Sequence, residues 1–64
     1  MNKSYAIRPR RLNGVDGFQI VYMFIGSYFH RHGFKADEYD VEGAWYESEH
    51  EAEKEAMNLQ MEEY

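Results

Sequence analysis

The stretch Phe18–Phe29, FQIVYMFIGSYF, decides the fold because it is the only run in the chain long and apolar enough to form the centre of a core. With a period of two, neither side of this run is polar. Its β-branched and aromatic residues favour a strand over a helix. We therefore expect a strand with a neighbour on each side, and a bulge or an end of pairing at Gly26-Ser27.

The segment before this run predicts an antiparallel partner strand. Ser4–Leu12, SYAIRPRRL, alternates in the manner of a strand but contains Pro9, which cannot donate a backbone hydrogen bond to a neighbour. We expect an edge strand with the Pro9 nitrogen facing outward. The five residues Asn13–Gly17 contain both NG and DG, which are strong hairpin signals, and we expect them to form the turn between the two strands.

The segment after the central run gives a weaker pattern. Asp37–Gly43 is too polar to be core, and Phe34–Tyr39 is a candidate for a further short strand. The next ordered piece is predicted at Gly43–Glu47. In a strand, Trp45 and Tyr46 would point to opposite faces.

The last part of the chain predicts a helix from about Glu49 toward the C-terminus. Ser48 and Glu51 form an S-x-x-E capping box, and good helix formers follow. Two apolar stripes lie on this helix: Ala52, Ala56 and Leu59 form one, and Met57, Met61 and Tyr64 form the other. We assign the alanine stripe to the sheet and expect the methionine and tyrosine stripe to be partly exposed; the alternative is that both stripes are core.

These elements predict an α+β fold: a small three-stranded antiparallel sheet, a β-meander, with one C-terminal helix packed on one face. The 64 residues form a single domain, 1–64, which buries only about 60% of the surface that its unfolded chain exposes. The chain has no cysteine and eleven aromatic residues, so aromatic packing, completed by a second chain in a homodimer, is the expected source of stability. No signal-like or membrane-spanning run is present, and we expect a cytoplasmic protein.

The charge divides the chain into a basic and an acidic half. Residues 1 to 36 sum to +5, whereas residues 37 to 64 carry eleven carboxylates against Lys54 and sum to −10. Either the two halves neutralise each other in the fold, or each meets a different partner.

Metal binding and catalysis find little support in the sequence. The possible metal ligands are His30, His32 and His50 with the carboxylates Asp37, Glu38 and Asp40. Their spacing matches no zinc pattern. No serine has a context that would make it a nucleophile, and Ser48 is already used as a cap. We expect no metal, no cofactor and no enzymatic activity.

The basic strand raises a nucleic-acid hypothesis. Arg8, Arg10 and Arg11, interleaved with Tyr5, form a candidate phosphate-binding edge. The chain as a whole is acidic, however, whereas nucleic-acid-binding domains are usually basic. We favour the interpretation that these arginines pair with the acidic helix or loop of their own chain.

The acidic helix raises a protein-binding hypothesis, which we prefer. Glu49 with Glu53 and Glu51 with Glu55 are like-charge pairs four residues apart, so this surface repels itself. A basic partner surface, for example the nucleic-acid groove of another protein, would offset the repulsion. The predicted partner-binding residues are Glu51, Glu55, Met57, Met61, Glu62 and Tyr64.

The predicted function is therefore a small non-enzymatic interaction module, a compact inhibitor or adaptor of the kind that phages and other mobile elements use. One alternative is a sheet-based nucleic-acid binder that uses Tyr5, Arg8, Arg10 and Arg11. Another is a homodimer with no further partner surface.

Overall fold

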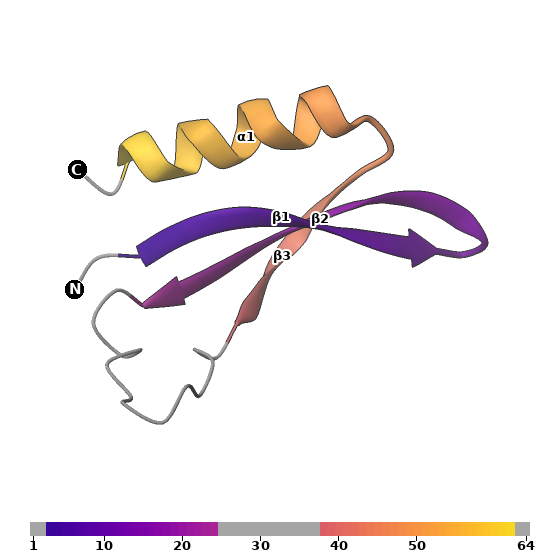
Figure 1. Ribbon diagram of the computed structural model, residues 1–64, viewed down its shortest axis with the longest axis horizontal. Coiled ribbons are helices and arrows are strands. Elements are labelled where there is room, and N and C mark those ends of the chain that lie inside the picture. The colour runs from indigo at the N-terminus through magenta and orange to yellow at the C-terminus, as the bar shows by residue number, and fades with distance from the viewer. Residues whose placement is uncertain (1–2, 25–37, 63–64) are drawn as a thin grey trace.

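Three antiparallel strands and one helix make up the described part of the chain. The computed structural model describes residues 3–24 and 38–62, with β1 at Lys3–Leu12, β2 at Val15–Phe24, β3 at Tyr39–Tyr46 and α1 at Glu49–Glu62. The strands form one sheet in the order β1-β2-β3, and α1 packs against one face (Figure 1). The α+β class and the predicted meander are therefore confirmed.

The β1–β2 hairpin turns on two residues. Leu12 pairs with Val15, and between them Asn13 and Gly14 have φ angles of 52° and 81°. Two positive φ angles are typical of the type I′ turn, whose twist matches that of the flanking strands. The prediction of a turn over Asn13–Gly17 was wrong, because the Asn-Gly pair is sufficient and the next three residues already belong to β2.

The central position of β2 is confirmed, since it pairs with β1 on one side and β3 on the other. β1 is an edge strand, as Pro9 predicted, and Pro9 lies opposite Phe18. The predicted strand ran to Phe29, whereas β2 ends at Phe24. The remainder of that prediction, including the bulge at Gly26-Ser27, lies outside the described residues.

β3 begins at Tyr39, four residues before the predicted start, and contains an irregularity. Asp40 and Trp45 both pair with residues on one face of β2, although five positions separate them. Their partners Val21 and Gln19 are only two positions apart, so β3 carries three extra residues there as a bulge, and Gly43, with φ of 77°, lies in this bulge. The Gln19 amide donates to the Val41 carbonyl at 2.9 Å, where the ladder is interrupted.

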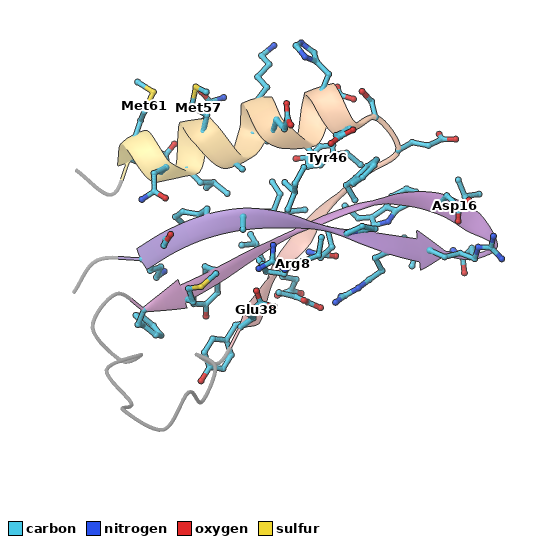
Figure 2. All side chains as sticks on the ribbon, viewed as in Figure 1. Arg8, Asp16, Glu38, Tyr46, Met57 and Met61 are labelled. Carbon is cyan, nitrogen blue, oxygen red and sulfur yellow. The ribbon has the colours of Figure 1, made fainter. Side chains whose placement is uncertain are left out.

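The core lies between the sheet and α1. Ala52 and Ala56 of the helix are 0% and 9% exposed, and Ala56 packs with Ile20 and Ala44 of the sheet. Small side chains let the helix backbone approach the strands closely. The predicted alanine stripe is confirmed, and Tyr46, which Figure 2 shows between helix and sheet, packs against the same cluster.

The start of α1 also follows the sequence prediction. The Glu51 backbone N–H donates to the Ser48 hydroxyl at 3.3 Å, which is the N-cap half of the capping box. The Ala52 N–H donates to the Ser48 carbonyl at 3.0 Å.

The end of α1 is fastened to the open edge of β1 by one side chain. The Gln60 amide accepts from the Tyr5 N–H at 2.9 Å and donates to the Lys3 carbonyl at 2.8 Å. These two backbone groups point away from β2, so Gln60 makes the pair of hydrogen bonds that a fourth strand would otherwise make. An edge strand covered in this way is less available for unwanted pairing.

We predict that Gln60→Leu lowers the free energy of unfolding by about 1–3 kcal/mol, since two partly buried hydrogen bonds are lost. Chemical denaturation measures the loss, and hydrogen exchange should become faster at Tyr5. Asn58→Leu, at an exposed position of the same helix, is the matched control. Equal stability of the two variants would contradict a fastening role for Gln60.

Candidate protein-interaction surface

The side of α1 that faces away from the sheet carries exposed methionines. Met57 and Met61 are 63% and 65% exposed, and Figure 2 shows both pointing away from the strands. This outcome excludes the alternative in which both helical stripes are core. Tyr64, the third member of the predicted stripe, lies outside the described residues.

The helical wheel places further side chains beside these methionines. At 100° per residue, His50 and Lys54 fall on the same outward ridge as Met57 and Met61. A shallow pocket of about 250 Å³ on this ridge is lined by His50, Glu53, Lys54 and Met57. The predicted site omitted His50 and Lys54, although the same wheel shows them.

Carboxylates flank this ridge on both sides. Glu53 lies on one flank, and Glu51, Glu55 and Glu62 lie on the other. All are exposed except Glu55, which is partly buried. We call the ridge and its flanks the outward surface of α1: His50, Glu51, Glu53, Lys54, Glu55, Met57, Met61 and Glu62.

The arginines of β1 do not neutralise these carboxylates. Arg8 pairs with Glu38, Arg10 pairs with Asp40, and the Arg11 Nε lies 2.9 Å from Asp16. Across residues 3–24 and 38–62, these three ion pairs involve no carboxylate of α1. The interpretation that the arginines pair within their own chain is right, but their partners lie in the sheet and in the residue before β3.

The residues of the nucleic-acid hypothesis lie on two different faces. Tyr5 and Arg11 are on the side of the sheet that α1 covers, whereas Arg8 and Arg10 are on the opposite side. Figure 2 shows Arg8 and Glu38 on the side away from the helix. The structure therefore does not assemble Tyr5, Arg8, Arg10 and Arg11 into one surface.

Two ion pairs cover the central strand on the side away from α1. Because β2 separates β1 from β3, the Arg8–Glu38 and Arg10–Asp40 pairs cross over it; we call them the cross-strand ion pairs. Beneath them, Gln19 and Val21 are only 8% and 2% exposed. These arginines therefore have a structural role.

Trp45 completes the cover on this side. Its indole N–H donates to the Arg10 carbonyl at 2.9 Å, so the ring reaches from β3 across β2 to β1. The ring lies directly over Gly17, where an added Cβ would be 2.2 Å from Trp45 Cζ2 and 2.7 Å from the Tyr46 carbonyl oxygen. Glycine is required at position 17 by this close approach.

We predict that Gly17→Ala lowers the free energy of unfolding by about 1–3 kcal/mol, because the new methyl group must displace the indole ring. Trp45 is the single tryptophan, so its fluorescence reports the displacement directly. The control is Asp16→Ala at the neighbouring exposed position, which should change stability by less than about 0.5 kcal/mol. A Gly17→Ala variant with native stability and native emission would contradict the placement of the ring.

The candidate metal ligands are not brought together where the structure describes them. Glu38 and Asp40 are engaged with arginines on one side of the sheet, while His50 lies on the outward surface of α1. Within the described ranges, no group of three histidine or acidic side chains is placed to hold a metal ion. His30, His32 and Asp37 lie outside those ranges.

No protein-family model, curated protein or solved structure matches this chain. In the described part of the chain, no helix has both the length and the apolar character needed to cross a membrane.

Proposed function

We propose that this protein is a small non-enzymatic interaction module that binds a protein partner with a basic surface through the outward surface of α1. The observation that carries the proposal is the exposure of Met57 and Met61 between carboxylates that lack an ion-pair partner among the described residues. Buried interface centres are commonly apolar, and flexible methionines adapt to a partner's shape. Complementary charge at the rim speeds and orients association.

Electrostatic repulsion between glutamates on α1 favours a partner of opposite charge. Two pairs of glutamates lie one helical turn apart: Glu49 with Glu53, and Glu51 with Glu55. Each like-charge pair destabilises a helix by about 0.2–0.5 kcal/mol. Lysine or arginine side chains of a partner would turn this repulsion into attraction. We propose that this chain belongs to the compact inhibitors or adaptors that phages and other mobile elements use.

We predict that Glu51→Gln/Glu55→Gln/Glu62→Gln weakens partner binding about tenfold, because the rim charges that meet the basic surface are removed. A photo-crosslinking residue at position 57 or 61 would first capture the partner from cells of the source. The affinity of the purified partner for wild type and variant would then be measured at two salt concentrations.

The matched control removes the same charge elsewhere, with Asp16→Asn/Glu42→Gln/Glu47→Gln in the sheet and the linker. Full affinity is expected for this control. Unchanged affinity of the helix variant, or an equal loss in both variants, would defeat the proposal.

The nucleic-acid alternative makes a separate prediction. Phosphates would have to displace Glu38, Asp40 and Asp16 from Arg8, Arg10 and Arg11. We expect no shift of duplex or single-stranded DNA and RNA probes at low salt. Micromolar or tighter binding that falls steeply with salt, and is lost in Arg8→Ala/Arg10→Ala/Arg11→Ala, would instead establish the alternative.

A further inference from the structure

β1 lies at the edge of the sheet, so every second residue directs its backbone N–H and C=O groups away from β2. Gln60 identifies which residues these are, because it contacts the Tyr5 N–H and the Lys3 carbonyl from the side away from β2. Alternation then places the backbone groups of Ile7 and Pro9 on the same side. We call these outward backbone groups, from Lys3 to Pro9, the outer edge of β1.

Each of the four positions on the outer edge of β1 has a backbone group that is covered or missing. The Gln60 amide covers one group at each of the first two positions, at 2.9 and 2.8 Å. At the third, the Arg8 Nη1 donates to the Ile7 carbonyl at 3.1 Å. At the fourth, Pro9 has no N–H to donate. An added strand needs alternating donors and acceptors, so it meets an obstacle at every position.

The three obstacles differ in origin. Pro9 is part of β1 itself, and Arg8 is also of β1 and is held in place by its ion pair with Glu38. Gln60 comes from α1, and Figure 1 shows the last turns of the helix beside the start of β1. Leu59, the residue before it, packs against the core cluster and so holds the amide at the strand. Gln60 is therefore the obstacle that depends on the helix being docked.

The opposite edge of the sheet is interrupted by the bulge in β3. Asp40 and Trp45 lie on either side of it, and the three extra residues include Gly43 with φ of 77°. A bulge bends the strand and breaks the regular spacing of its outward groups, so a new strand cannot pair across it in register.

We propose that the outer edge of β1 is a strand-docking site that Gln60 holds closed, and that this closure keeps the protein a monomer. Without the Gln60 amide, the Lys3 carbonyl and the Tyr5 N–H lose the partner that occupies their outward side. The segment that then becomes accessible runs from Lys3 to Arg8 and ends at the proline. A second β1 fits this segment, because an antiparallel two-fold pair of one strand brings each donor opposite the matching acceptor.

Sedimentation velocity of wild type and of Gln60→Leu over a range of concentrations tests this proposal. Wild type should sediment as a monomer throughout, whereas the sedimentation coefficient of the variant should rise with concentration toward that of a dimer. The bulge in β3 should prevent growth beyond the dimer. Gln60→Ala should associate in the same way, and Asn58→Leu, which places a leucine at an exposed position of the same helix, should stay monomeric.

Amide hydrogen exchange locates the contact. In dilute Gln60→Leu, the Tyr5 amide should exchange about tenfold faster than in wild type, because the hydrogen bond to the side chain is lost. In concentrated Gln60→Leu, protection should return at Tyr5 and extend to Ile7. Circular dichroism establishes that each variant is folded, and trimethylamine N-oxide, which favours the folded state, keeps a marginally stable variant measurable.

Three results would overturn the proposal: a wild-type chain that dimerises, folded Gln60 variants that stay monomeric at every concentration, and association that protects β3 or α1 while β1 is unchanged. The outward surface of α1 takes no part in this closure. Loss of partner binding in the triple glutamine variant therefore tests the proposed function, and self-association of the Gln60 variants tests the closed edge, each without the other.

Discussion

The fold depends on burying both faces of the central strand β2, and different groups cover the two faces. Ile20 and Val21 are neighbours in sequence, point to opposite faces, and are 0% and 2% exposed. The single helix can bury only one face of the sheet, so the other face of β2 needs a different cover. On the other face, the cross-strand ion pairs and Trp45 cover the strand. The aliphatic stems of the arginines can also cover apolar surface on that face, so these residues contribute packing in addition to their ion pairs.

The sequence predicted those features that depend on local pattern. Pro9 marked the edge strand, Ser48 and Glu51 marked the start of the helix, and the alanine spacing marked its buried stripe. Each of these signals acts within a few residues, so a single sequence is enough to read it. The turn was predicted too long because the second Gly-containing pair, Asp16-Gly17, resembles a turn but is needed for the Trp45 contact.

Features that join distant segments were not predictable in the same way. Gln60 is 55 residues from Tyr5, and nothing in its local sequence distinguishes it from any exposed helical glutamine. The partners of Arg8 and Arg10 depend on the register of β3 with its bulge, which the sequence did not reveal. Those arginines pair with Glu38 and Asp40, so they do not neutralise the carboxylates of α1, and this division of charge is the basis of the candidate surface.

The bulge at Gly43 has a consequence for comparing this chain with any relative. It reverses the side-chain alternation of β3, so Val41 and Ala44 reach the core although three positions, an odd number, separate them. A relative that lacked the three extra residues would have regular alternation and would place apolar and polar positions in the opposite phase. An ungapped alignment across this strand would then equate interior residues with surface ones.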